Sequence, residues 1–338
     1  MLTGHGNDIY QYDDEIIVDF SSNIGKTHIR EKLLAFLQKK IKDINNYPEP
    51  EAVQLKKCIA KFHNVTVDEV VICNGSTEAF YLVAQTFSNK RSLIRIPSFS
   101  EYEDACSRYD HKIKFEVEIT PETIANNELI WFGNPNNPDG KVTPLKTIEE
   151  WCNQFPDQLF VIDEAFGDLS NGFKSSISLV KKHANIVVIR SLTKSFSIPG
   201  LRLGYIIAKK DIVTRIKKYL IPWNINTLAI DAGVFIMNNY DNLMPDVKDL
   251  SRTCESFIKE MKKVKGVNVT PTASNFFIAE LPKGTAAELK LYLLKNHGLL
   301  IRDASNFRGL TPQHFRVSVR SSQQNLMLVN AIQTWMNL

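Results

Sequence analysis

The sequence lacks long hydrophobic runs, and no stretch approaches the ~18 apolar residues that a membrane-spanning helix needs. Glycine and proline are also sparse, at 15 and 14 of 338 residues, which excludes collagen-like and low-complexity chains. With 43% hydrophobic and 23% charged residues, the chain can bury a sizeable core. We therefore expect a globular protein with one large domain or two unequal lobes, and no membrane partner.

No charge of one sign dominates. The 41 Lys and Arg residues nearly balance the 37 Asp and Glu residues, and they are spread along the chain. This even distribution is unlike the clustered basic surface of a nucleic-acid-binding protein, so a small metabolite is the better partner. The polar and acidic first fifteen residues predict neither a signal peptide nor a transit peptide, which favours the cytoplasm.

Paired cysteines and nucleotide-binding glycine motifs are also missing. The five cysteines are odd in number and never in Cys-x-x-Cys spacing, which argues against a disulfide framework and a zinc site. We expect reduced thiols and no metal. Neither Gly-x-Gly-x-x-Gly nor Gly-x-x-x-x-Gly-Lys occurs, so dinucleotide-binding and P-loop functions lose their main support.

Short apolar segments alternate with helical segments between residues 45 and 224. This alternation predicts an α/β domain with a doubly wound sheet, in which ligands bind beyond the carboxyl ends of the strands. The expected strands are Val70–Cys73, Leu93–Ile96, Leu129–Phe132, Leu159–Ile162, Ile186–Ile189 and Tyr205–Ala208, and the expected helices are Glu78–Phe87, Tyr102–Tyr109, Thr147–Phe155 and Ser176–Lys182.

Residues 1–44 and 225–338 predict a second, smaller α+β domain that packs directly on the first. Apolar residues recur at helical spacing in Ile29–Ile44, which predicts a core-facing helix that includes Leu33, Leu37 and Ile41. The other expected elements are a long helix Leu243–Lys265, the strands Val267–Thr270, Phe276–Leu281, Leu299–Arg302 and His314–Val319, and the helices Ala286–Asn296 and Ser322–Trp335.

Lys194 follows the expected strand Ile186–Ile189, in a turn that contains serines and a glycine, and Arg202 comes eight residues later. Two cations with hydroxyl groups nearby, placed at a strand end, suit a phosphate group. Positive charge beside the Lys194 amine also lowers its pKa and makes it a better nucleophile toward an aldehyde. Taken singly, each cation is more typical of a solvated surface loop.

A second strand end carries Gly75, Ser76 and Thr77, directly before the helix expected from Glu78. Backbone N–H groups and hydroxyls at a helix N-terminus can hold a phosphate, because the helix dipole is positive there. The same run is also a common helix cap.

Two further strand ends carry Asn137, in Asn-Pro-Asn-Asn-Pro, and Asp163. A carboxylate that directly follows an apolar strand is costly to bury unless a cation meets it, so Asp163 calls for a partner such as a protonated ring nitrogen. Asn137 can donate to a ring oxygen. Each residue alone is also compatible with a turn or a helix cap.

The joint order of these motifs along the chain resembles that of the pyridoxal-phosphate enzymes of fold type I, the aspartate-aminotransferase superfamily (class I/II). The resemblance covers nearly the whole chain. It implies the fold of the PLP-dependent transferases, with a mostly parallel seven-stranded sheet in the large domain, and pyridoxal 5′-phosphate as cofactor. It further implies that Lys194 bonds to the cofactor aldehyde, that Asp163 pairs with the pyridinium nitrogen, and that Asn137 binds the ring hydroxyl oxygen.

The same resemblance implies further cofactor contacts. Phe99 occupies the position of an aromatic residue that stacks on the pyridine ring. Phe166 stands where many aminotransferases have a tyrosine, so the ring oxygen has one donor fewer. Tyr47 matches a tyrosine that reaches the phosphate of the neighbouring subunit, which implies a homodimer with shared active sites. The implied phosphate ligands are Gly75, Ser76, Thr77, Ser191 and Arg202.

Two terminal segments narrow the resemblance to the threonine-phosphate decarboxylases, which make aminopropanol phosphate for the cobalamin side chain, with the histidinol-phosphate aminotransferases as the nearest relatives. The first segment holds His5 and Asn23, and the second holds Arg302 and Arg316. The arginines match anion-binding positions in both families, and two guanidinium groups suit a substrate with a carboxylate and a phosphate. His5 and Asn23 are further candidates for substrate binding.

The resemblance leaves the reaction open. Decarboxylation and transamination both begin at the substrate α-carbon, and the arginines decide which of its bonds is aligned to break. We favour a decarboxylase of a phosphorylated amino acid because of the two terminal segments, with a histidinol-phosphate-type aminotransferase as the alternative. A non-catalytic sensor that binds pyridoxal phosphate is a second alternative, which we do not favour because we expect no DNA-binding recognition helix at the N-terminal end.

Overall fold

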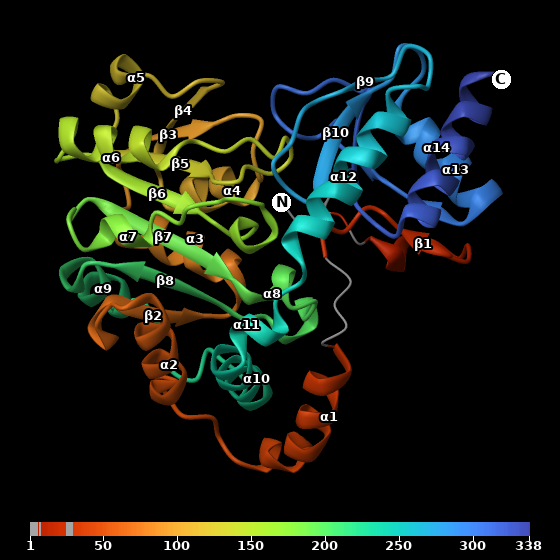
Figure 1. Ribbon diagram of the computed structural model, residues 1–338. Helices are drawn as coiled ribbons and strands as arrows, with labels where there is room; N and C mark the ends of the chain where they lie inside the picture. The colour runs from red at the N-terminus through yellow and green to blue at the C-terminus, as the bar shows by residue number, and fades with distance from the viewer. Residues whose placement is uncertain (1–5, 7, 25–29) are drawn as a thin grey trace.

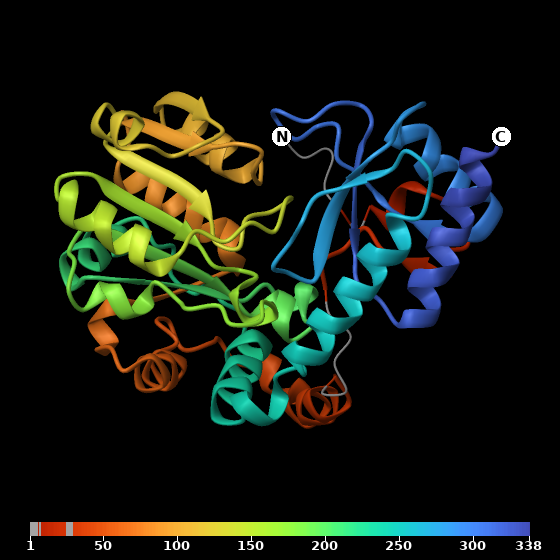
Figure 2. The same ribbon diagram turned by 45° about the horizontal axis from the view of Figure 1, so that its top comes forward.

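The computed structural model describes Gly6 and residues 8–24 and 30–338, and it shows two domains side by side (Figure 1). The large domain is built on a seven-stranded sheet, and the smaller domain on a four-stranded sheet. In Figure 2 the mutually parallel strands of the large sheet point their carboxyl ends toward the small domain. The residues described include no helix with the length and apolar character to cross a membrane.

The large sheet confirms the predicted doubly wound, mostly parallel α/β architecture. β8 runs antiparallel to its neighbours β2 and β7, whereas the other neighbouring pairs are parallel. In order across the sheet, the strands are β2 (Val70–Cys73), β8 (Gly204–Ala208), β7 (Ile186–Ser191), β6 (Leu159–Asp163), β5 (Leu129–Gly133), β3 (Arg91–Arg95) and β4 (Lys112–Glu116).

The sequence analysis missed the edge strand β4. Its residues are exposed or half-buried and three of its five carry charge, so it lacks the apolar run by which the other six strands were predicted. Charged residues are common on edge strands, where they discourage pairing with another chain.

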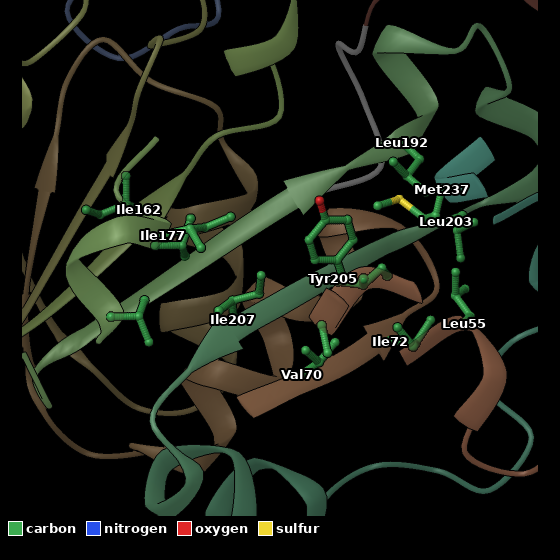
Figure 3. Close-up of a cluster of buried hydrophobic side chains, with 14 of the residues drawn as sticks. Leu55, Val70, Ile72, Ile162, Ile177, Leu192, Leu203, Tyr205, Ile207 and Met237 are labelled. Carbon is green, nitrogen blue, oxygen red and sulfur yellow. The ribbon is translucent and has the colours of Figure 1, made fainter. Parts of the chain in front are cut away.

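Alternation along the strands fills a separate core on each face of the sheet. Val70 and Ile72 of β2 point into one core, whereas Val71 and Cys73 point into the other. Figure 3 shows the first core, where Leu55 approaches the strands from a covering helix. The first face is covered by α2 (Val53–His63), α6 (Leu145–Gln154), α7 (Ile177–Val180) and α10 (Thr227–Asn238), and the second by α3 (Gly75–Thr86), α4 (Glu101–Arg108) and α9 (Lys210–Lys217).

Packing divides the chain differently from the expected boundaries at residues 44 and 225. α1 (Arg30–Lys40) and α10 lie below the large sheet in Figure 1, and Leu33 and Ile236 belong to its first core. The helix expected over Ile29–Ile44 ends at Lys40 and continues as a 3₁₀ turn, η2 (Ile41–Asn45), which has fewer residues per turn. The apolar side chains after Lys40 therefore no longer face the core, and Ile41 is 53% exposed.

The small domain has an antiparallel sheet and an added strand pair. In order, the sheet holds β12 (Arg302–Asp303), β13 (His314–Ser318), β10 (Phe276–Glu280) and β9 (Asn268–Val269). β1 (Val18–Asp19) pairs in parallel with β11 (Leu299–Leu300), so the N-terminal arm packs on this domain. Its helices are α12 (Val247–Met261), α13 (Ala286–His297) and α14 (Ser322–Met336).

The expected long helix Leu243–Lys265 is interrupted. A short helix, α11 (Tyr240–Leu243), ends before Pro245, and α12 begins after Asp246, which caps it by accepting from two backbone N–H groups. A proline disfavours the helical conformation of the residue before it, which accounts for the break. α12 therefore joins the small domain, where Phe257 and Met261 lie in the core.

Candidate active site

A cavity of about 350 Å³ lies where the carboxyl ends of the large sheet face β12 and β13. Most of the residues singled out in the sequence line it, although they come from both domains. These are Asn23, Ser76, Thr77, Phe99, Asn137, Asp163, Phe166, Lys194, Arg202, Arg302 and Arg316. The convergence follows from the topology, since parallel strands end at one edge of a sheet.

Three of the other candidates do not line this cavity, and one lies outside the described residues. Gly75 forms part of the backbone beneath Arg202, as shown below. Ser191 is buried, and its hydroxyl bonds to Thr193 Oγ1 at 2.7 Å and caps the next helix. Tyr47 is 86% exposed elsewhere, with its ring centroid 5.4 Å from that of Trp223. His5 is not among the described residues.

Lys194 lies in the short helix α8 (Leu192–Ser195), directly after β7. Burial, together with the positive charges of Arg316 and Arg202, lowers the pKa of its amine to about 8. The carboxylate of Asp163 opposes this shift but does not overcome it. The side chain is thus a far better nucleophile near neutral pH than an exposed lysine.

Asp163 ends β6 and is 8% exposed. Burial raises the pKa of its carboxyl to about 6, although hydrogen bonds from the Tyr102 phenol at 2.7 Å and the Ala165 N–H at 2.9 Å lower it. The carboxylate is therefore held in a site that favours a cationic partner.

Tyr102 was not among the predicted site residues. It lies in the first turn of α4, three residues after Phe99, and its ring is buried in the core of the second face. A signal for Tyr102 exists in the sequence: it begins the expected helix Tyr102–Tyr109, directly after the loop that follows a strand and carries Phe99.

The N-terminus of α3 is open enough to receive a ligand because Gly75 has no side chain. Gly75 has φ +77°, and a Cβ there would lie 2.5 Å from Arg202 Nη2. Gly204 is required for the same approach, since its Cβ would lie 2.8 Å from the backbone nitrogen of Ser76. The Arg202 guanidinium thus lies over the start of a helix whose N–H groups and hydroxyls suit an anion.

Arg302 and Arg316 are directly opposite each other on the antiparallel strands β12 and β13. Arg316 donates to Asn137 Oδ1 and to the carbonyl oxygen of Ser21, the latter at 2.8 Å. Arg302 donates to Asn306 Oδ1 at 2.6 Å. Burial lowers the pKa of Arg316 to about 9, with a further contribution from Arg302. Two buried guanidinium groups in one wall attract anions.

Two polar atoms at this wall are buried without a hydrogen-bond partner among the described residues. They are Asn23 Oδ1 and Arg316 Nε. Buried polar groups of native proteins are nearly always bonded, so these atoms favour a bound polar ligand. Phe166, which also lines the cavity, packs its ring edge-on against Phe276, with centroids 4.8 Å apart, and offers no hydroxyl.

Comparison with known proteins bears directly on this cavity. The profile of a family described as "Aminotransferase class I and II" matches residues 15–332, nearly the whole chain. The chain belongs to this family. The predicted family resemblance is confirmed, and the class I and II aminotransferases use pyridoxal phosphate.

Three relatives within this family are similar over most of their length. The solved structure of the L-threonine-O-3-phosphate decarboxylase from Porphyromonas gingivalis is 37% identical with a TM-score of 0.93, over 95% of this chain and 100% of that one. The threonine-phosphate decarboxylase of Salmonella typhimurium is 27% identical over 94% of this chain and 90% of its own. The solved histidinol-phosphate aminotransferase from Clostridium acetobutylicum is 27% identical with a TM-score of 0.86, over 95% and 99% of the two chains.

The residues that line the cavity of the present protein fit pyridoxal phosphate. The start of α3 and Arg202 form a cradle that a Cβ on Gly75 would fill, and such a cradle suits a phosphate. Asp163 is a buried carboxyl group with a raised pKa, and a cationic ring nitrogen beside it would stabilise its charged form. Lys194 is an amine of lowered pKa in the same cavity. Among the residues that the structure describes, no three His, Cys, Asp or Glu side chains are grouped to hold a metal.

Proposed function

We propose that this protein is a pyridoxal-phosphate-dependent decarboxylase of a phosphorylated amino acid. The observation that carries the proposal is that Lys194 and Asp163 share one cavity with two buried arginines, Arg302 and Arg316. The first pair supplies the groups that the cofactor needs, and the second suits a substrate with two anionic groups. The similarity to threonine-phosphate decarboxylases over nearly the whole chain supports the same choice.

The residues of the large domain would hold the cofactor. Ser76, Thr77 and Arg202 would bind its phosphate, and Asp163 would keep its ring nitrogen protonated. When bound, pyridoxal phosphate withdraws electrons from the substrate α-carbon and so weakens the bonds to that carbon. Asn137 would donate its amide N–H to the ring oxygen, since its Oδ1 already accepts from Arg316.

The residues of the small domain would orient the substrate. Arg302 and Arg316 would divide a carboxylate and a phosphate between them, and this division decides which bond to the α-carbon is held ready to break. In decarboxylation the bond to the carboxylate breaks and carbon dioxide leaves. Lys194 then delivers a proton from Nζ to the α-carbon, and the product is an amine phosphate. The lowered pKa of Lys194 lets Nζ exchange that proton near neutral pH.

A product assay tests the reaction. The holoprotein is incubated with threonine phosphate, and separately with histidinol phosphate and a keto acid. We expect carbon dioxide and an amine phosphate from the first mixture. A new amino acid from the second mixture, with no carbon dioxide from the first, would favour the aminotransferase. Lys194→Ala is the control for reactions of the free cofactor.

A labelling experiment tests the cofactor separately from the substrate. Borohydride reduction of the holoprotein followed by peptide mapping should place the reduced cofactor on Lys194. An adduct on another lysine, or no adduct, would contradict the assignment. An adduct on Lys194 without turnover of any amino acid would instead point to a non-catalytic sensor.

We also propose a homodimer in which Tyr47 reaches the active site of the other subunit. In support, Tyr47 and Trp223 form an exposed aromatic pair, and Tyr47 is absent from the lining of the cavity in its own chain. The test mixes Tyr47→Phe and Lys194→Ala chains after denaturation. Hybrid dimers would hold one intact site, so activity should return on mixing. No recovered activity would mean that each site is built within one chain.

A further inference from the structure

A buried cluster of charges contacts the segment that carries Lys194, and its members do not line the cavity. Its centre is Arg190, the last residue but one of β7, which is 4% exposed. The Arg190 guanidinium donates to Asp168 Oδ1 through one nitrogen and to Glu164 Oε2, at 3.1 Å, through another. Gly167 makes room for this arrangement, since a Cβ there would lie 2.9 Å from Arg190 Nη1.

Both carboxylates of the cluster are tied to the segments that carry the cofactor-binding residues. Glu164 directly follows Asp163 in the chain, and it accepts from Ser175 Oγ and the Ser176 N–H at 2.5 and 2.6 Å. Asp168 Oδ2 accepts from Ser195 Oγ at 3.1 Å. Ser195 directly follows Lys194 and is fully buried.

Such a cluster is a poor means of stabilising a fold. Taking an arginine and two carboxylates out of water is costly, and apolar side chains of similar volume often stabilise a protein as well or better. The cluster can, however, fix the relative orientation of the backbone segments that it joins. Charge-assisted hydrogen bonds of defined geometry link the end of β6, the end of β7 and the short helix α8.

We infer that Asp168, held by Arg190, is a positioning residue that fixes the backbone of Lys194 through the hydroxyl of Ser195. α8 has only four residues, so it has little helical stability of its own and depends on such outside contacts. The inference rests on the proposed function, because it assigns the network a role only if Lys194 reacts.

Two serine variants separate positioning from simple stabilisation. Ser195→Ala removes the hydroxyl that joins Asp168 to the segment of Lys194. Ser175→Ala is the matched control, since it removes a hydroxyl bonded to the same cluster at Glu164, away from Lys194. For both holoproteins we would measure kcat and KM for threonine phosphate, the pH dependence of the cofactor absorbance, and the urea midpoint of unfolding.

We expect Ser195→Ala to lower kcat by roughly ten- to a hundredfold with KM within about twofold, because displacing a reacting group by about 1 Å has an effect of this size. The pH at which the cofactor absorbance changes should shift as well. Ser175→Ala should keep the wild-type kcat and pH dependence, even if its urea midpoint falls. Equal kcat values in the two variants would overturn the inference.

Two further results keep the conclusions separate. If Ser195→Ala does not fold, Asp168→Asn replaces it, because the amide keeps the shape of the carboxylate and removes its charge. A wild-type kcat in Asp168→Asn would likewise overturn the inference. If wild-type protein shows no borohydride adduct on Lys194, the proposed function itself fails, whereas an adduct with unchanged Ser195→Ala kinetics contradicts only the positioning role.

Discussion

The phenol of Tyr102 donates a hydrogen bond to the carboxylate of Asp163 at 2.7 Å. The two residues lie 61 positions apart, on α4 and β6, and both are buried. Burial raises the pKa of Asp163 to about 6, and the Tyr102 bond is the largest contribution that lowers it. Tyr102 therefore helps Asp163 to stay ionised near neutral pH, which is the state that a ring cation needs.

Tyr102→Phe should raise the pKa of Asp163 and lower kcat/KM. A hydrogen bond to a charged group contributes about 1.5–3 kcal/mol, so a loss of roughly ten- to a hundredfold is expected. The loss should be smaller at high pH, where Asp163 is ionised even without the phenol. Tyr109→Phe, at the end of the same helix, is the control. A pH-rate profile identical to wild type in Tyr102→Phe would refute this role.

The pKa of Lys194 predicts how pH controls cofactor capture. The amine reacts only when neutral, and its pKa is lowered to about 8. The rate at which cofactor-free protein captures added pyridoxal phosphate should therefore rise about tenfold per pH unit below pH 8 and level off above it. Stopped-flow absorbance measures this rate.

Arg316→Met tests whether the charge of Arg316 contributes to the lowered pKa of Lys194. The Arg316 charge lowers the pKa of Lys194, so removing that charge should move the midpoint of the pH profile to higher pH. A profile that still rises steeply above pH 9 in wild type, as for an exposed lysine, would contradict the lowered pKa.

Gly75→Ala should weaken the binding of pyridoxal phosphate, because the new Cβ would displace the Arg202 guanidinium. Gly172→Ala is a close control: Gly172 also has a positive φ, +71°, but a Cβ there meets nothing within 4 Å. Both variants should lose roughly 1–2 kcal/mol of folding stability from backbone strain. Only Gly75→Ala should raise the Kd of the cofactor, by about tenfold or more. Equal Kd values would show that Arg202 does not need this space.

Arg302→Ala and Arg316→Ala should each weaken a phosphorylated amino acid by roughly ten- to a hundredfold, since each removes a charge-assisted contact. The pattern across substrates identifies the anion. An arginine that binds phosphate should matter little for plain threonine, whereas one that binds the carboxylate should affect both substrates. Arg252→Ala, on the exposed face of α12, is the control. Equal losses for both substrates in both variants would favour a general amino-acid aminotransferase.

Local sequence determined the architecture of the large domain and the positions of Asn137, Asp163 and Lys194. Buried strands of a parallel sheet must be apolar along their whole length, so six of them were visible as short apolar runs. Polar residues directly after such runs were then expected at one edge of the sheet. The edge strand β4 escaped because a half-exposed strand does not need that composition.

Only the tertiary structure decided which distant residues meet. No local pattern places Tyr102 against Asp163, Arg202 over Gly75, or Ser195 on Asp168, because these contacts depend on how whole elements pack. The packing of α1 and α10 under the large sheet is of the same kind. Apolar periodicity predicts which face of a helix is buried, but it does not predict which other element of the fold covers that face. The choice between them is made by the shape and charge of the assembled core, which no short segment of the chain contains.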